Sequence, residues 1–522
     1  MSQTQTVVEL TTNPPAFKTD APTPAPAVLA SDHEPTPVSL SKGPTAAIFF
    51  SIGGVTLISS MLAGVVTVAL PHMVTALKIP PSLLLWPASI YALTCGCSLI
   101  LSGAIADIVG SRFMYILGTG LQSVFTLACG LARTSTQLIV FRGLAGIAIA
   151  FCLPSAVSLV TSYFPHGPRR NMAFATMGGG QPLGFAIGLV MGGVLSDSPA
   201  SWRGAFYIGA GINTLVLIVT FFGLPKLAPG RGVEWAKLWT DLDWTGALLL
   251  SASLGMLSYV FAAITGAVST IRQPATIVLL TLAVLLIPVF AFWVHRQEKL
   301  GRPAIIPNSI WRNRVFTSIC FDVFLLWGAF NSMEVLLTFF FQDVQLLSAT
   351  QSSIRFLPLP VTGLVVNIFI GAVIHRLRAN WAIVLSTLIS CISPILTAVM
   401  TPTDTYWEYV FPAITLSAIG CDVLFTASNL VITNAFPDNT QALAGGVFNT
   451  VAQIGKSVGL AISAIIANRI SEAREDSGKP HTLVLLEGYR GAWWFCLAST
   501  AAVVLISIAG LRNIGKLGVK RD

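Results

Sequence analysis

The sequence predicts an all-α membrane protein, and three observations point to this class. Only 10% of the 522 residues are charged, while 54% are hydrophobic. An ordinary soluble domain carries about 25% charged residues. The mean hydropathy is +0.76. Apolar runs of about 20 residues, the length that crosses a bilayer as a helix, recur along most of the chain.

Fourteen of these runs are predicted to be transmembrane helices. Short polar loops separate them, which indicates consecutive crossings of the bilayer. The ninth and twelfth runs are each long enough to include a turn at the membrane surface. The predicted spans are residues 46–70, 83–104, 113–131, 137–160, 173–195, 204–224, 244–265, 275–294, 315–341, 354–374, 380–400, 407–433, 443–467 and 490–511.

The start of the chain differs in composition from the rest. Residues 1–44 are rich in Thr, Pro and Ala and show no hydrophobic periodicity. Such a composition cannot bury a core, so we expect a disordered tail. This tail lacks the basic start and the early apolar core of a secretory signal peptide. A short tail, residues 513–522, is expected after the last span.

The distribution of cations predicts the orientation in the membrane. An even number of spans places both termini on one side. With the N-terminus inside, the inner loops hold thirteen Lys and Arg residues, the outer loops hold nine, and the tails add six more to the inner side. Cytoplasmic loops carry an excess of Lys and Arg, so we expect both termini in the cytoplasm. The net charge of +8 is explained by these loops and does not indicate nucleic acid binding.

The cysteines and histidines form no metal or disulfide pattern. The six histidines fall in the tail or the loops, which argues against a membrane-embedded enzyme with clustered ligands. A nucleotide-binding P-loop is absent from the sequence, which argues against ATP-driven export. All eight cysteines fall inside apolar runs, where small buried hydrophobic side chains explain them better than disulfides do. They are Cys95, Cys97, Cys129, Cys152, Cys320, Cys391, Cys421 and Cys496.

The loop between the second and third spans contains an ordered set of polar residues. In Gly103-Ala-Ile-Ala-Asp107-Ile-Val-Gly110-Ser-Arg112 a carboxylate, a turn glycine and a cation follow one another. Taken alone, this is either an ordinary solvated connection or a tight loop that locks helix ends. The pattern resembles the signature of the major facilitator superfamily, and Gly103, Ile105, Asp107, Gly110 and Arg112 fill the expected places.

This resemblance implies that Gly103, Asp107, Gly110 and Arg112 form a conformational latch. In the outward-facing state the family's aspartate caps a helix of the opposite half, and a carboxylate is favoured at a helix N-terminus. The thirteenth span would offer such an end near Ala444. The family often has a cation directly after the aspartate, where this chain has an isoleucine.

Three short stretches, Trp202-Arg203, Asp243-Trp244-x-Gly246 and Arg355-Phe-Leu-Pro358, resemble the fourteen-span drug/proton antiporter branch of this family, of the fungal toxin and drug efflux type. Two longer stretches resemble signatures of the family and of its drug/proton antiporters. Leu138-x-x-x-Arg142-x-x-Ala145-Gly146 is similar to the fourth-helix signature, with Ala145 in place of the usual glutamine. The glycines of the fifth span resemble the antiporter signature, with Leu189 in place of a proline. A spacing of four advances about 40° per step, so these glycines share a face that lets another helix approach closely. They are Gly180, Gly184, Gly188, Gly192 and Gly193.

The resemblance implies a major facilitator fold with 14 transmembrane helices, two six-helix halves plus two inserted helices. Residues 45–225 would form the first half, residues 226–314 the inserted helices with their loops, and residues 315–512 the second half. The sequence offers one internal check. Gly371-Ala-Val-Ile-His375-Arg376-Leu-Arg378 is the pseudo-symmetric counterpart of the Gly103–Arg112 loop, with His375 where the aspartate belongs.

Ionisable residues inside the predicted spans are candidates for function. A charged side chain in the bilayer is costly, so each should face a cavity or a partner. Asp322, Glu334 and Asp422 could carry protons, because a buried carboxylate can be protonated reversibly. Glu334 could instead simply reach the outer interface, near the end of its span. Arg142 could face a cavity or a partner, or extend to the outer interface.

The thirteenth span carries a polar stripe. Asn449, Gln453 and Lys456 are spaced four and three apart, which places them on one helical face. The stripe could bind substrate, or Lys456 could form a structural ion pair with Asp422 or Asp322; the sequence favours neither. Many antiporters of this branch carry an acid in the first span, and the matching position here is apolar. Any proton coupling must therefore use other acids.

Together these features predict a secondary active transporter, not an enzyme. The expected activity is proton-coupled efflux of small organic compounds (drugs, toxins or secondary metabolites) by alternating access. The alternatives are import of a nutrient or small metabolite by the same fold and, more remotely, a membrane-embedded enzyme or receptor. The expected partners are a small organic substrate, protons and the lipid bilayer, with no cofactor beyond the proton gradient, no nucleic acid, and a monomeric chain. The plasma membrane is the expected location, and a vacuolar or other internal membrane is the alternative.

Overall fold

The computed structural model describes residues 42–80, 83–164, 168–225, 242–266, 272–373, 378–436 and 438–512. Within these ranges, 14 helical segments are long and apolar enough to cross a membrane, as the sequence predicts. The predicted C-terminal tail, residues 513–522, lies outside the described residues, and so does the predicted N-terminal tail up to residue 41. The first helix begins at Lys42, so the expected disorder of residues 42–44 is wrong. The loop residues His375 and Arg376 also lie outside the described residues.

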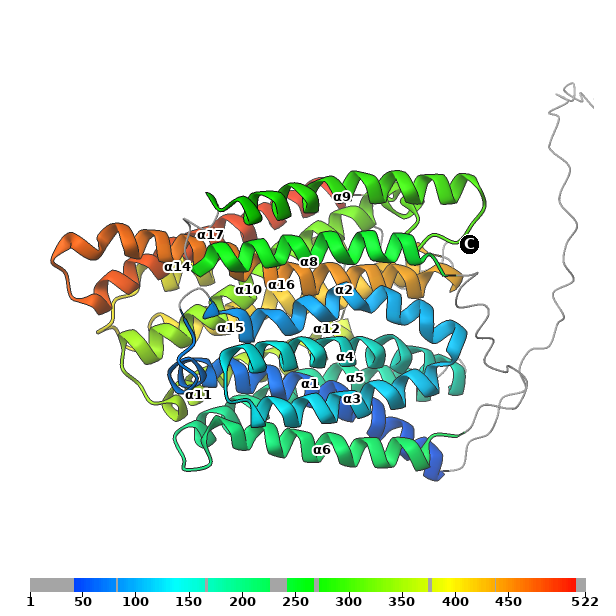
Figure 1. The fold of residues 1–522 in the computed structure, drawn as a ribbon, viewed down its shortest axis with the longest axis horizontal. Coiled ribbons are helices and arrows are strands. Elements are labelled where there is room, and N and C mark those ends of the chain that lie inside the picture. The colour runs from blue at the N-terminus through cyan, green and yellow to red at the C-terminus, as the bar shows by residue number, and fades with distance from the viewer. Residues whose placement is uncertain are drawn as a thin grey trace, which may run out of the picture. The chain divides into compact units, whose positions relative to one another are not determined.

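The first half consists of six helices, each forming one span. α1 packs closely against α5, α2 packs against α4, and α3 contacts both α4 and α6. Figure 1 shows these helices side by side along one direction. They are α1 (Lys42–Ala76), α2 (Trp86–Val109), α3 (Ser111–Leu131), α4 (Ser135–Tyr163), α5 (Pro168–Ser196) and α6 (Ser201–Gly223).

Two further helices follow the first half in sequence and form a hairpin. α8 (Trp244–Gly266) packs against α9 (Pro274–Lys299), and α8 also contacts α2 and α16 (Asp438–Arg474). Ser251 of α8 donates a hydrogen bond of 3.0 Å to the carbonyl oxygen of Cys97 in α2. The predicted inserted pair therefore lies against one helix from each half.

The second half also contains six spans, and two of them consist of two helices each. The tenth span breaks where Pro358 follows α11, and the eleventh breaks before Pro394. Proline has no N–H to donate to the carbonyl four residues earlier, so the helical hydrogen bonding is interrupted there. The elements are η3 (Asn308–Arg312), α10 (Arg314–Phe339), the π-helical turn η4 (Phe340–Val344), α11 (Ala349–Phe356), α12 (Pro358–Val373), α13 (Ala379–Ser390), α14 (Ile392–Val399), α15 (Val410–Ala435), α16, η5 (Glu475–Ser477) and α17 (His481–Gly510).

The sequence predicts these two spans as residues 354–374 and 380–400, and both are present as apolar spans, Ala349–Ile370 and Ala379–Val399. The predicted bounds of the tenth span start late. Its first helix begins at Ala349, where Ser348 provides a capping box with Gln351. A serine followed three residues later by glutamine is a helix-start signal that precedes the apolar run.

The two halves meet through buried apolar side chains. Val68 and Leu70 of α1 and Leu189 of α5 belong to the same buried cluster as Leu336 and Phe340 of the second half. This cluster lies toward the end of the body that carries Asp197 and α11, which we call the Asp197 end. The opposite end, formed by the α2–α3 turn, is called the Gly110 end.

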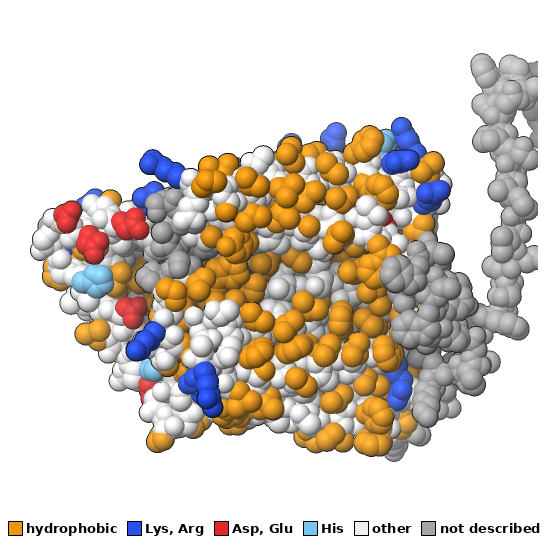
Figure 2. All heavy atoms as spheres, viewed as in Figure 1, with side chains coloured by type: hydrophobic (Ala, Val, Ile, Leu, Met, Phe, Trp, Pro, Cys, Tyr) orange, Lys and Arg blue, Asp and Glu red, His pale blue; other side chains and the backbone are white. Residues whose placement is uncertain are grey.

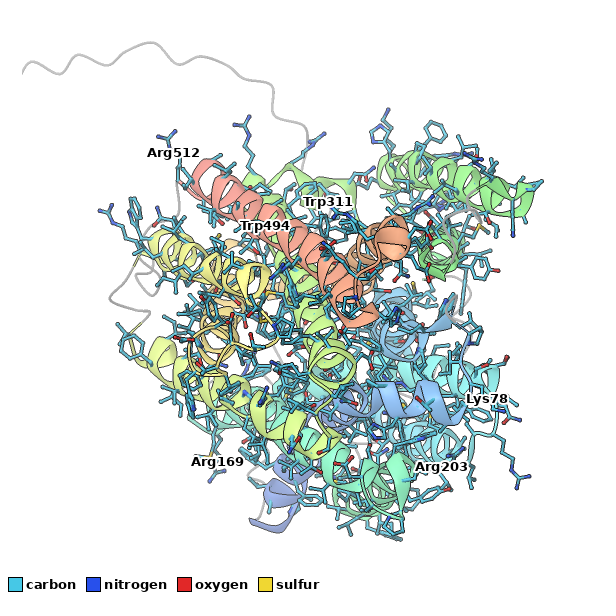
Figure 3. All side chains as sticks on the ribbon, turned by 90° about the vertical axis from the view of Figure 1, so that its left-hand side faces the viewer. Lys78, Arg169, Arg203, Trp311, Trp494 and Arg512 are labelled. Atoms are coloured by element: carbon cyan, nitrogen blue, oxygen red, sulfur yellow. The ribbon has the colours of Figure 1, made fainter. Side chains whose placement is uncertain are left out.

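The surface has the distribution that a bilayer requires. Figure 2 shows hydrophobic side chains over the middle of the body and charged side chains gathered toward its two ends. Figure 3 views the body along the helices: Lys78 and Arg203 of the first half lie on one side, and Trp494 and Arg512 of the second half lie on the other. The described residues thus form an integral, multi-pass membrane protein.

Candidate functional site

At the Gly110 end, the signature loop ties three helices together. Gly110 is the only residue between α2 and α3, and its φ of 105° is a backbone conformation that favours glycine. Arg112 donates hydrogen bonds from Nε to the carbonyl oxygen of Leu224 (3.2 Å) and from Nη2 to that of Phe221 (3.0 Å). A cation at a helix C-terminus is electrostatically favourable, so Arg112 fixes the end of α6.

Asp107 does not act as a cap in this structure. Its side chain is exposed, and it forms no hydrogen bond or ion pair in the part of the chain that the structure describes. Gly103 lies one turn before Asp107, and a Cβ added to Gly103 would be 3.5 Å from the side chain of Pro154 in α4. The helix cap by Asp107 that the family resemblance implies for the outward-facing state is therefore not formed among the described residues of this structure.

The glycines of α5 allow α1 to approach at backbone distance. A Cβ added to Gly180 would lie 2.9 Å from Thr56, and one added to Gly192 would lie 2.9 Å from the Cα of Val65. At Gly184 and Gly188 it would overlap the backbone carbonyls of α1. Gly193 lies instead against α11 of the second half. Four of the predicted glycines thus face α1, and the fifth faces α11.

Arg142 has partners inside the first half and does not extend to the membrane surface. Its side chain is 3% exposed. Nε donates a hydrogen bond of 3.0 Å to the carbonyl oxygen of Pro87, and the guanidinium lies 4.7 Å from the ring centroid of Tyr91. Tyr91 in turn shares a 2.8 Å hydrogen bond with Ser59 of α1. Arg142 therefore links α4 to α2 and, through Tyr91, to α1.

Asp322 lies between α10 and α17. The hydroxyl of Ser507 donates a 2.8 Å hydrogen bond to Oδ2, while the other carboxylate oxygen is buried without a hydrogen bond among the described residues. The side chain is fully buried. This places Asp322 on the face of α10 that packs within the second half.

A different face of α10 carries Trp327, Asn331 and Glu334. They are spaced four and three apart and are all partly buried. The ammonium of Lys456 lies 4.2 Å from the ring centroid of Trp327, and Asn331 donates a hydrogen bond of 3.3 Å to the backbone carbonyl of Lys456. Glu334 lies within electrostatic range of Lys456.

Lys456 is held by an aromatic ring and not by the ion pair considered from the sequence. Within the described residues no carboxylate lies within 4 Å of its ammonium. Trp327 packs edge-on against Phe330 and Phe425, with ring centroids 5.6 Å and 6.1 Å away. The Lys456 ammonium therefore lies against one ring of an aromatic cluster formed by Trp327, Phe330 and Phe425.

Asp422 belongs to a second polar group close to the middle of α15. Asn367 of α12 donates a 3.1 Å hydrogen bond to Oδ1 of Asp422 and accepts one of 2.9 Å from Thr426. Asp422 is partly buried. Gly363 leaves room for the carboxylate, because a Cβ there would lie 2.7 Å from its Oδ2.

The polar stripe of the thirteenth span lies on one partly buried face of α16, as its spacing predicts. Gln453 lies close to the first half. A Cβ added to Gly96 of α2 would be 3.1 Å from the Cβ of Gln453. Asn449 donates a hydrogen bond of 2.9 Å to the carbonyl oxygen of Gly445, one turn earlier.

The structure thus brings together the α10 residues, Lys456 and its aromatic neighbours, while Asp322 and Arg142 lie elsewhere. Sequence reasoning missed Trp327 and the glycines that join α10 to α16. A Cβ added to Gly328 would lie 2.8 Å from the carbonyl oxygen of Gly455, and one on Gly459 would overlap the backbone of Gly328. The signal was present, because Gly455 and Gly459 are four residues apart on one helical face.

Comparison with known proteins agrees with this arrangement. A family model described as Major Facilitator Superfamily matches residues 52–460 and 360–513. "MFS-type transporter 1" of Pyricularia oryzae is 38% identical, and the alignment covers 92% of this chain and 85% of that protein. "Efflux pump terJ" of Aspergillus terreus is 25% identical, over 82% of this chain and 80% of its own length. The "Low affinity ammonium transporter" of Saccharomyces cerevisiae is 26% identical, over 81% and 79%.

Among solved structures, the fold is similar to a bacterial homologue of the human lysosomal transporter Spinster, described as inward-facing and unoccupied. The TM-score is 0.64 at 17% sequence identity, covering 91% of this chain and 99% of that one. The fold, the fourteen apolar helices and the family match lead to one conclusion: this chain belongs to the Major Facilitator Superfamily and is a secondary transporter.

Proposed function

We propose that this transporter exports small, largely apolar organic compounds in exchange for protons. The observation that carries the proposal is the partly buried contact between α10 and α16, where Lys456 lies against the ring of Trp327 and within electrostatic range of Glu334. Aromatic walls bind varied apolar molecules without strict geometry, and a carboxylate in the membrane interior can gain and lose a proton.

The proposed mechanism is alternating access, with the substrate bound between the halves near the midplane. Glu334 and Asp422 are the proton carriers, because both are carboxylates within membrane spans and both are only partly buried. Asp322 takes no direct part, since its carboxylate is turned toward Ser507 in α17. Both termini and the Gly110 end face the cytoplasm, and the plasma membrane is the site of action.

Names of related proteins support export over import. One is called an efflux pump, another an "Aminotriazole resistance protein" of Saccharomyces cerevisiae, and a third a "Methylenomycin A resistance protein" of Bacillus subtilis. A relative named as a low affinity ammonium transporter keeps import as the competing function.

The test compares cells that express the chain with vector-only cells on a panel of toxins and drugs. Export predicts resistance to some compounds, lower accumulation of these compounds, and loss of the difference when an uncoupler dissipates the proton gradient. Greater accumulation in the expressing cells would establish import instead. Resistance that survives the uncoupler would overturn proton coupling while leaving export in place.

A further inference from the structure

At the Asp197 end, one carboxylate of the first half holds the start of a helix of the second half. Asp197 directly follows α5, and its backbone N–H still donates to the carbonyl oxygen of Gly193 (3.3 Å). Oδ2 accepts a hydrogen bond of 2.8 Å from the backbone N–H of Thr350, and Oδ1 accepts one of 3.3 Å from that of Ala349. Both donors belong to the first turn of α11.

The backbone N–H groups in the first turn of α11 thereby find acceptors in both halves of the protein. The first N–H groups of a helix have no partner within it, and they attract negative charge. Ser348 accepts from the N–H of Gln351 at 3.2 Å, which is a cap within the second half. The preceding two N–H groups are left to Asp197. If the two halves separated at this end, these donors would lose their charged acceptor.

The backbones of the two helices touch close to this cap. Gly193 of α5 packs against Ser353 and the carbonyl oxygen of Ala349, and a Cβ at position 193 would overlap the Ser353 hydroxyl. The contact therefore fixes the distance between α5 and α11, so that the Asp197 carboxylate reaches the N–H groups without a bridging water.

Asp197 is ionised where it forms this contact. Burial raises its pKa, but the hydrogen bonds to the carboxylate, chiefly from Thr350, have the larger effect and hold the pKa below its usual range. His72 of α1 lies 3.7 Å from Oδ1 through its Nε2. The negative charge thus lies between a helix N-terminus of the other half and a histidine of its own half.

A second contact joins the halves at the same end. Gln342 of η4 donates a 2.8 Å hydrogen bond from Nε2 to the carbonyl oxygen of Val68 in α1. At the opposite end, Asp107 is exposed and has no partner among the described residues. The structure therefore shows charged and polar links between the halves at the Asp197 end while the signature aspartate at the other end is free.

We propose that Asp197 is a conformational latch that closes the Asp197 end by capping α11. The latch holds the state in which substrate can exchange only at the Gly110 end, and it must be released once in every transport cycle. It is a positioning residue and contacts no substrate. The inference rests on alternating access, the mechanism of the proposed function.

The test measures opening at this end directly. Spin labels at Thr75→Cys in α1 and Ile354→Cys in α11, both at exposed positions, report the distance between the halves in purified protein without substrate. All eight native cysteines are free, and none is exposed, so the chain without the introduced pair gives the background. Asp197→Ala should raise the ratio of long to short distances on the order of tenfold, since a charged group that loses its partner shifts a two-state equilibrium by about that factor.

A graded series and a matched control separate a latch from a general structural effect. Asp197→Asn keeps one acceptor oxygen, so its ratio of long to short distances should lie between those of the wild type and Asp197→Ala. Asp404→Asn is the control, because Asp404 accepts from Thr401 (2.7 Å) within its own loop and has a pKa lowered by that bond. Unchanged distances in Asp197→Ala, or an equal change in Asp404→Asn, would overturn the latch. Since no substrate or gradient is used, this result is independent of whether the chain exports drugs.

Discussion

Asp322 and Asp422 are both acidic residues within apolar helices, yet their surroundings differ. Asp422 shares Asn367 of α12 with Thr426, whereas Asp322 accepts a hydrogen bond from Ser507 of α17. Asp322 is fully buried and Asp422 only partly, so a proton can reach the Asp422 carboxylate more readily. Burial and hydrogen-bond partners therefore distinguish two acids that look alike in the sequence.

Replacing Asp422 by asparagine should abolish gradient-driven transport while the protein still folds. Asp322→Asn, a buried acid of the same size, is the matched control and should retain transport. The measurement is efflux from proteoliposomes under an imposed pH gradient, with folding checked by size-exclusion chromatography. Full transport by Asp422→Asn would remove this residue from the coupling scheme.

The cation–π contact between Lys456 and Trp327 should contribute to stability. Such contacts are worth about 0.5–2 kcal/mol, depending on how far the cation is desolvated. A double-mutant cycle of Lys456→Met and Trp327→Leu in thermal unfolding should give a coupling energy of about this size. Additive effects of the two substitutions would show that the ammonium gains nothing from the ring.

At the scale of helices, the α1–α5 crossing depends on the absence of side chains on one face of α5. Gly184→Ala should destabilise the protein by about 1–3 kcal/mol, because the new methyl group overlaps the Leu57 backbone. Gly178→Ala is the control on the same helix. Nothing lies within 4 Å of its added Cβ, so it should leave stability unchanged or raise it by up to about 1 kcal/mol. Equal melting temperatures for both variants would contradict the close crossing.

The elements show what can be predicted from this sequence and what cannot. The length of each apolar run predicts its span, because crossing a bilayer sets a fixed helix length. The break at Leu357 could have been predicted from Pro358. The face of α10 on which Asp322 lies could not, since that depends on which helix packs beside it. The cap by Asp197 joins residues about 150 positions apart, and no local pattern indicates such a partner.

For the whole molecule, two aspartates are predicted to favour opposite conformations. Asp197 closes one end in the structure, and the family signature implies that Asp107 closes the other in the alternate state. Asp107→Asn should therefore slow turnover with nearly unchanged substrate affinity, and it should shift the spin-label distances opposite to Asp197→Asn. The double variant should return the distances toward those of the wild type. A double variant that matches either single variant would contradict this balance.

The crossing of α10 and α16 has a consequence for the size of substrates. Gly328, Gly455 and Gly459 place two backbones in direct contact, so these helices cannot slide apart to make space. Trp327 and Lys456, carried one on each helix, must then travel as one rigid wall through the cycle. A bulky compound has to find its room away from this contact. Substitution of side chains beside Trp327 and Lys456, rather than of the glycines, should therefore change which molecules are accepted.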